Sequence, residues 1–204
     1  GGRVTEGALP PRPDNAETAP IVPGRACGSC TLCCKVMEIG ELGKPAGQWC
    51  AHVLTGKGCG IYAERPHACS AFGCGWLHWK DAGDHWLHAK SKMVIVAQDQ
   101  SRLVVHVDPA TPNVWKAAPF YPDLKRWIRS PARYGFRQVL VAVGRRMTAS
   151  LPDRDIDLGE VPHDAVVISG PIGGGRHTAV VVGPDDPQLE KVRAGGSYTF
   201  TGRH

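Results

Sequence analysis

Alternating and continuous runs of β-branched residues mark the C-terminal two thirds of the chain. Residues 93–97 and 102–107 are two such runs, separated by four polar residues, which is typical of a β-hairpin. Residues 139–143 form a third run, which indicates a buried strand paired with residues 147–151. Two more strands are predicted at 166–168 and 177–182, and a short helix near Glu190.

One longer helix is predicted over about residues 122–130. Leu124, Trp127 and Ile128 recur there at helical spacing, just after a Pro-Phe-Tyr-Pro opening. The glycine run at 169–175 lacks the Gly-Lys-Ser/Thr ending of a phosphate-binding loop, so it predicts a flexible hairpin tip.

These patterns predict an α+β fold, in which a cysteine-rich helical and loop region packs against a mostly antiparallel β portion. Residues 1–23 are rich in proline and predict an extended or disordered arm, or a strap across the surface. The cysteine region is expected at 24–92. The remainder of the same domain, or an appended lobe, is expected at 93–192, and a loose tail at 193–204.

Composition limits the classes of function. The 204 residues are 42% hydrophobic, which is enough for a true core. The net charge of +5 comes with no nucleic-acid recognition motif, so we interpret it as a solvated basic face and expect no nucleic-acid partner. No run of 18 apolar residues is present, so no membrane partner is expected. The start of the chain has no apolar signal segment, which favours a cytoplasmic location.

All eight cysteines lie within 48 residues, which suggests either a disulfide framework or a metal site. A disulfide framework is typical of small secreted domains, whereas this chain is long enough to fold around a core. Adjacent cysteines seldom pair with each other, yet both can reach a metal, so thiolate ligation is favoured. The candidate ligands are Cys27, Cys30, Cys33, Cys34, Cys50, Cys59, Cys69 and Cys74.

The first four cysteines are spaced for a compact site if residues 26–37 form a helix. At 100° per residue, Cys27, Cys30 and Cys34 share one face, and Cys33 lies about 60° from Cys30. The glycines around Cys59 allow the backbone to approach a bulky centre, and Pro66 prevents a helix from running through to Cys69.

Two motifs in this region resemble a known family. The first is C-x-x-C-x-x-C-C at 27–34, and the second is C-x-I-Y-x-x-R-P-x-x-C-x-x-F-x-C at 59–74. Together they are similar to the CxxCxxCC cysteine-cluster family of bacterial zinc- or iron-chelating proteins, over about residues 24–80. The resemblance implies metal chelation. One branch of the family is associated with flagellin lysine methylation, which implies a protein-modifying enzyme as one alternative.

The thiols allow one iron–sulfur cluster with spare cysteines, two four-cysteine zinc sites, or a binuclear site. A structural zinc site typically uses two C-x-x-C pairs separated by a loop. This chain has one dense group of cysteines followed by single ones, so an iron–sulfur cluster is favoured over Zn²⁺. We therefore expect a redox or cluster-dependent function, with an electron-transfer protein or another protein as the partner. A zinc-stabilised, non-catalytic partner-binding module is the alternative.

Other side chains near the cysteines are candidates for supporting roles. Tyr62 and Arg65 could contact a bound cofactor or substrate, and Arg65 could equally clamp a carboxylate or backbone carbonyls, the role that we favour. His67 is the first histidine to consider as an alternate ligand or as a donor to one. The stretch from Trp76 to His88 holds three tryptophans and three histidines, which we interpret as an aromatic cover with histidines at its rim.

Overall fold

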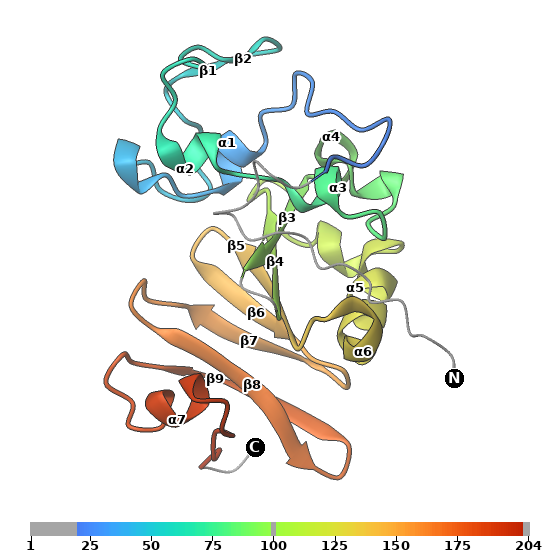
Figure 1. Cartoon of the computed structure of the whole chain (residues 1–204), viewed down its shortest axis with the longest axis vertical. Helices are drawn as coiled ribbons and strands as arrows, with labels where there is room; N and C mark the ends of the chain where they lie inside the picture. The colour runs from blue at the N-terminus through green and yellow to red at the C-terminus, as the bar shows by residue number, and fades with distance from the viewer. Residues whose placement is uncertain (1–19, 99–100, 202–204) are drawn as a thin grey trace.

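The computed structural model describes residues 20–98 and 101–201 and has the α+β architecture that the sequence predicts. Figure 1 shows the cysteine-bearing elements at one end of a twisted sheet and a separate β-hairpin at the other. In the ranges that are described, no helix has the length and apolar character needed to cross a membrane.

A five-stranded sheet forms the centre of the molecule, in the order β3-β4-β5-β6-β7. Three of its four pairings are antiparallel, and β4 and β5 are parallel, with Arg102 opposite Gln138 and Val107 opposite Val143. Its strands are β3 (Met93–Gln98), β4 (Arg102–Val107), β5 (Gln138–Val143), β6 (Arg146–Ser150) and β7 (Asp155–Glu160). The predicted hairpin and the predicted pair at 139–151 are therefore confirmed, whereas β7 was not predicted.

A helical crossover joins the two parallel strands, as parallel pairing requires. It contains η4 (Val114–Lys116), α5 (Phe120–Arg129) and α6 (Pro131–Tyr134). The predicted helix at 122–130 is confirmed as α5, which begins two residues earlier than expected.

An aromatic core fills the space between α5 and one face of the sheet. Trp79 and Trp86 both stack against Trp127 of α5, with ring centroids 4.5 and 5.0 Å apart. Phe136 meets the Trp79 ring edge-on at 5.2 Å, and all four side chains are buried. The tryptophans of the 76–88 stretch therefore serve burial, as predicted.

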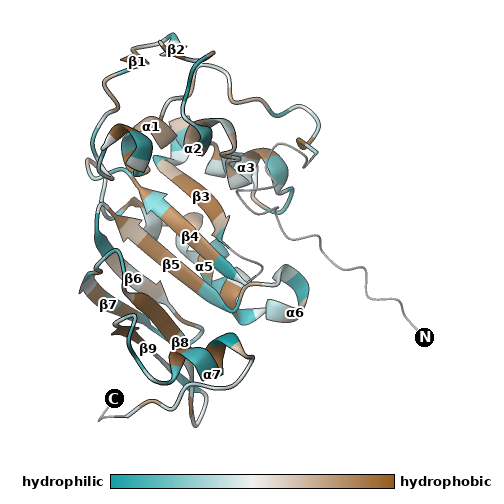
Figure 2. Cartoon of the chain, turned by 60° about the vertical axis from the view of Figure 1, so that its left-hand side comes forward, coloured by the Kyte–Doolittle hydropathy of each residue, from teal (hydrophilic) through white to brown (hydrophobic). Residues whose placement is uncertain are grey.

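The opposite face of the sheet is covered by a two-stranded hairpin, β8 (Val166–Gly173) with β9 (Arg176–Val182). Val104, Leu140 and Ala149 of the sheet pack with Val167 and Ala179 of the hairpin in a second apolar cluster. Figure 2 shows the strands of the sheet as hydrophobic along much of their length, because helices cover one face and the hairpin covers the other.

The cysteine region consists of short elements joined by turns. They are α1 (Cys33–Val36), η2 (Gly40–Leu42), β1 (Val53–Leu54), β2 (Gly58–Cys59), α2 (His67–Ser70), α3 (Gly75–His78), η3 (Asp84–Trp86) and α4 (His88–Ser91). The prediction of a helix over residues 26–37 is wrong, because only α1 is helical. Gly28 has a φ of 57°, in the left-handed region, so residues 27–30 form a turn instead.

The two ends of the described chain are tied to the surface. The Val22 amide donates to the carbonyl of Leu77 at 2.8 Å, which attaches residues 20–23 to α3, while residues 1–19 of the predicted arm lie outside the described ranges. The predicted short helix is α7 (Leu189–Arg193). In the tail predicted at 193–204, Tyr198 donates to Asp186 at 2.9 Å and the Thr199 amide donates to Gln188 at 2.7 Å.

Helix α3 approaches the edge strand β3 unusually closely. A Cβ on Gly75 would lie 2.8 Å from the backbone oxygen of Ile95, which is closer than side chains tolerate. Arg25 then fixes the turn that follows α3, because its guanidinium donates to the carbonyls of Trp76, Trp79 and Ala82. The end of the cysteine region is thereby attached to the sheet.

Gly75→Ala tests this contact. We expect a loss of about 1–3 kcal/mol in the free energy of unfolding, because backbone must move to admit a methyl group, although alanine favours a helix more than glycine does. Urea unfolding followed by tryptophan fluorescence measures the loss. Gly183→Ala is the matched control, since nothing lies within 4 Å of its added Cβ and its φ is not positive. Equal stability of the two variants would contradict the close approach.

His106 gives the sheet a pH-dependent stability. It lies in β4 between Val94 and Ala142, and its Nε2 is buried without a partner in the described ranges. Burial lowers the pKa of His106 to about 4. The folded protein therefore binds fewer protons than the unfolded chain below the usual pKa of 6.5, so stability is lost as the pH falls from 6.5 toward 4.

The variant His106→Leu removes this contribution. We expect its urea midpoint to fall less than that of the parent protein between pH 7 and pH 5, because leucine takes up no proton on unfolding. Parallel pH dependence of the two proteins would show that His106 is not held neutral by burial.

Candidate metal centre

A first set of cysteines lies around His88. The Cys30 sulfur is 3.3 Å from Nδ1 of His88, and the Cys74 sulfur is 2.5 Å from Nε2 of the same ring. The Cys27 sulfur lies 3.9 Å from the carbonyl oxygen of Cys30. Two cysteines that are 44 positions apart in the sequence thus contact one imidazole, and Cys27 lies next to one of them.

Short local elements hold this set in place. Cys74 is the residue before α3 and is buried beside the close contact of Gly75 with β3. His88 begins α4 and is 3% exposed, and the edge of the Trp76 ring packs against its imidazole. Burial raises the pKa of Cys74 to about 12 and lowers that of His88 to about 4. Both groups are therefore neutral at pH 7 in the metal-free chain.

A second set comprises Cys34, Cys50, Cys59 and Cys69. The Cys50 amide donates to the carbonyl of Cys34 at 3.0 Å, and the β1–β2 ladder brings Cys59 opposite Val53, three residues beyond Cys50. Burial raises the pKa of Cys69, and the negative charges of Cys34, Cys50 and Cys59 raise it further. The other three sulfurs are therefore close enough to Cys69 to affect its ionisation.

Glu41 orients the helix that carries Cys69. Its two carboxylate oxygens accept hydrogen bonds from the amides of His67 and Ala68 at 3.1 and 2.8 Å, at the start of α2. A carboxylate at this position satisfies amides that have no partner within the helix. Pro66 precedes α2 as its N-cap, so the proline starts the short helix that carries Cys69.

The adjacent residues Cys33 and Cys34 connect the two sets. The negative charges of Cys27 and Cys30 help to raise the pKa of Cys33, whereas those of Cys33, Cys34, Cys50 and Cys69 all act on Lys44. The Cys33 thiol donates a hydrogen bond to the Cys34 sulfur, which lowers the pKa of Cys34 to about 7, and the positive charge of Lys44 lowers it as well. Cys34 also helps to raise the pKa of Cys27, after burial and Cys30, so Cys33 and Cys34 both lie between the two sets.

Lys44 places a cation next to the second set. Lys44 is 7% exposed. Its ammonium donates a hydrogen bond to the carbonyl of Lys35 at 3.0 Å and another to the carbonyl of Met37. Burial lowers the pKa of Lys44, while the charges of the surrounding cysteines act to raise it. A buried ammonium beside several thiols favours their ionised form, which is the form that binds metals.

The chemistry of the donor set suits a thiophilic metal. All eight cysteines are free thiols, and their thiolates are the ligands that zinc and iron–sulfur clusters use. Within residues 20–98 and 101–201, no group of three or more Cys, His, Asp or Glu side chains is already close enough together to hold a metal ion. The sulfurs of each set would have to move inward on binding.

The other predicted site residues take supporting positions. The Arg65 guanidinium lies 3.9 Å from the centre of the Tyr62 ring and donates to the Tyr62 carbonyl at 3.4 Å, so these two residues contact each other. His67 is exposed, and its ring has no hydrogen bond among the described residues. His85 donates to Asp123 at 2.6 Å, away from the thiols.

His88 is the residue that sequence reasoning misplaced. We expected it at the rim of an aromatic cover, whereas it is buried between two cysteines. Its position five residues before the edge strand β3, with Trp86 two residues earlier, could have indicated burial.

Comparisons with known proteins do not identify a relative. No family model matches the chain, and neither the curated proteins nor the solved structures contain a match.

The thiols should differ in reactivity in protein treated with a chelator and a reductant. We expect iodoacetamide at pH 7 to modify Cys34 much faster than Cys74, because about half of Cys34 is thiolate at its pKa of about 7, while Cys74 is buried with a pKa of about 12. Peptide mass spectrometry over a time course measures each rate. Preferential modification of Cys74 would contradict the arrangement.

Proposed function

We propose that residues 27–74 bind metal through cysteine thiolates, as an iron–sulfur cluster or as Zn²⁺. The observation that carries this proposal is the gathering of eight free thiols into two neighbouring sets, which meet at Cys33 and Cys34. Disulfide bonds would consume these thiols in pairs, whereas the structure leaves every one of them available.

Each set supplies four donors, the number that a tetrahedral zinc ion or an iron–sulfur cluster requires. The first set consists of Cys27, Cys30, Cys33 and Cys74, with His88 in contact with two of them. The second set consists of Cys34, Cys50, Cys59 and Cys69. His88 either replaces one sulfur as a ligand or orients the sulfurs from outside. Lys44 offsets part of the negative charge that four thiolates bring to the second set.

Exposed apolar side chains near the second set favour a function that involves a protein partner. Trp49, Leu54 and Tyr62 are 53%, 50% and 67% exposed, and each lies within a few residues of Cys50 or Cys59. Such side chains are common at protein interfaces. An iron–sulfur cluster here would exchange electrons with a partner protein, whereas zinc here would stabilise a partner-binding surface.

Anaerobic purification followed by metal and acid-labile sulfide analysis tests the proposal. Iron with sulfide and visible absorption would identify a cluster, and zinc without sulfide would identify a thiolate zinc site. Protein that contains neither metal, even after reconstitution with iron and sulfide or with zinc, would contradict metal binding.

Single cysteine variants test whether each set binds its own metal centre or both sets share one. Cys30→Ser and Cys69→Ser each remove one sulfur from a different set, so each should lose about half of the bound metal if the sets are independent. If one shared centre spans both sets, each variant should lose nearly all of it. Ser29→Ala is the matched control next to Cys30 and should keep its full metal content. Full metal content in both cysteine variants would exclude these sets as the ligands.

A further inference from the structure

A cleft of about 510 Å³ lies between the C-terminal end of α5, the β6–β7 turn and the β8–β9 hairpin. Its size falls within the range of roughly 300–1,000 Å³ that is typical of small-molecule sites. In Figure 1 these elements lie toward the opposite end of the sheet from the cysteine-bearing helices α1 and α2. The cleft is therefore separate from the candidate metal centre.

The lining of the cleft combines apolar surface with positive charge. Pro131, Pro152 and Pro171 provide the accessible apolar walls, whereas Ile128 and Leu151 also line the cleft but are only 4% and 2% exposed. Arg129 and Arg137 also line the cleft. In the ranges that the structure describes, neither guanidinium pairs with a carboxylate. Nε of Arg129 donates to the Pro152 carbonyl at 2.8 Å, and the Arg137 side chain makes no hydrogen bond or ion pair there.

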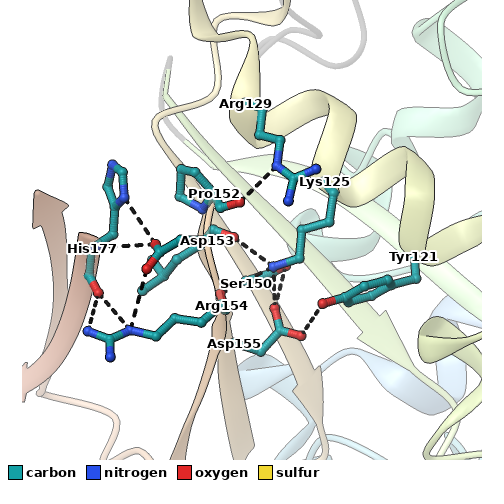
Figure 3. Close-up of polar contacts among 10 residues, drawn as sticks. Tyr121, Lys125, Arg129, Ser150, Pro152, Asp153, Arg154, Asp155 and His177 are labelled. Carbon is teal, nitrogen blue, oxygen red and sulfur yellow. Dashed lines mark hydrogen bonds and ion pairs between the residues drawn. The ribbon is translucent and has the colours of Figure 1, made fainter. Parts of the chain in front are cut away.

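The acidic side chain that follows Pro152 in the sequence is already engaged. Oδ1 of Asp153 accepts from both the amide and Nδ1 of His177 at 3.1 Å, and Oδ2 lies 3.8 Å from Nε of Arg154. Since a carboxylate can only accept, Nδ1 of His177 carries the proton, and Nε2 is left for another partner. Figure 3 shows His177 and Arg129 on either side of Pro152.

The walls of the cleft are fixed before any ligand binds. The buried Lys125 ammonium donates to the carbonyls of Leu151 and Arg154 and to Asp155, which ties the β6–β7 turn to α5 (Figure 3). On the other wall, Gln138 donates to the Val167 carbonyl and to the Ser169 hydroxyl. Fixed walls reduce the entropy that a ligand loses on binding.

We propose that this cleft binds an organic carboxylate, with the carboxylate between Arg129 and Arg137 and the hydrocarbon body against the prolines at 131, 152 and 171. A guanidinium matches the planar carboxylate with two parallel hydrogen bonds. A purely inorganic anion would make no apolar contact with the walls. The ligand therefore needs both a carboxylate and a hydrocarbon body. Nε2 of His177 provides a further polar contact at the edge of the cleft.

Calorimetric titration of the full chain with 4-phenylbutyrate and with octanoate tests this site. We expect saturable binding of at least one of the two with a Kd of about 1 mM or lower. The neutral 4-phenylbutyramide should bind at least tenfold more weakly than 4-phenylbutyrate, because it lacks the charge that the arginines recognise. Inorganic phosphate should also bind at least tenfold more weakly, because it lacks the apolar body.

Arg137→Gln locates the binding site. We expect it to weaken 4-phenylbutyrate or octanoate binding at least tenfold without changing thermal unfolding, since the side chain makes no bonds in the described part of the protein. Arg133→Gln is the matched control: its guanidinium lies over the Tyr134 ring, outside the cleft lining, and binding should be unchanged.

Three outcomes would overturn the proposal. One is the absence of saturable binding of both carboxylates up to about 20 mM, well above the affinity expected of a specific site. The second is equal binding of carboxylate and amide, or of carboxylate and inorganic phosphate. The third is equal binding by the Arg137→Gln, Arg133→Gln and parent proteins.

Discussion

The contact between Gly75 and the backbone of β3 is the constraint on which the cysteine region depends. The elements from α1 to α4 are each three or four residues long at most, and such short helices have little stability of their own. They keep their places because α3 packs directly on the sheet edge and Arg25 holds the following carbonyls. Cys74 precedes this contact directly, so the sheet fixes one sulfur, and the other thiols are arranged relative to it.

Electrostatics sets the second constraint on this region. Neighbouring thiols raise one another's pKa, as they do at Cys69, so ionising all of them is costly without positive charge nearby. A buried cation, Lys44, lies on the side of the second set, and a neutral imidazole, His88, lies on the side of the first. The two sets therefore differ in their electrostatic environment, although their sulfur content is the same. A metal ion would supply the charge that the protein itself does not.

The sequence predicted the elements that are determined by the residue pattern within the element itself. The strands β3, β4 and β5 are β-branched runs, and α5 has apolar residues at helical spacing, so both were found. The helix over 26–37 failed because cysteine spacing alone suggested it, while Gly28 adopts a left-handed conformation. Strand β7 was missed although Ile156 and Leu158 alternate with acidic residues, because Gly159 interrupts the pattern. The resemblance to the cysteine-cluster family stays a prediction, and so does the bound metal. The cleft at Arg129 and Arg137 could not be predicted, because five separate stretches of the sequence meet there only in the folded chain.

The single parallel pairing in the sheet has a consequence for how the chain folds. Strands β3 and β4 form a hairpin, and β5, β6 and β7 follow one another through short turns, so both units contain only local contacts. The pairing of β4 with β5 joins them across the thirty residues from 108 to 137, and closing such a loop is slow compared with forming a hairpin. We expect the two units to form early and their union to limit the rate of folding. The cysteine region, attached through the edge of β3, then orders on a surface that the first unit already provides.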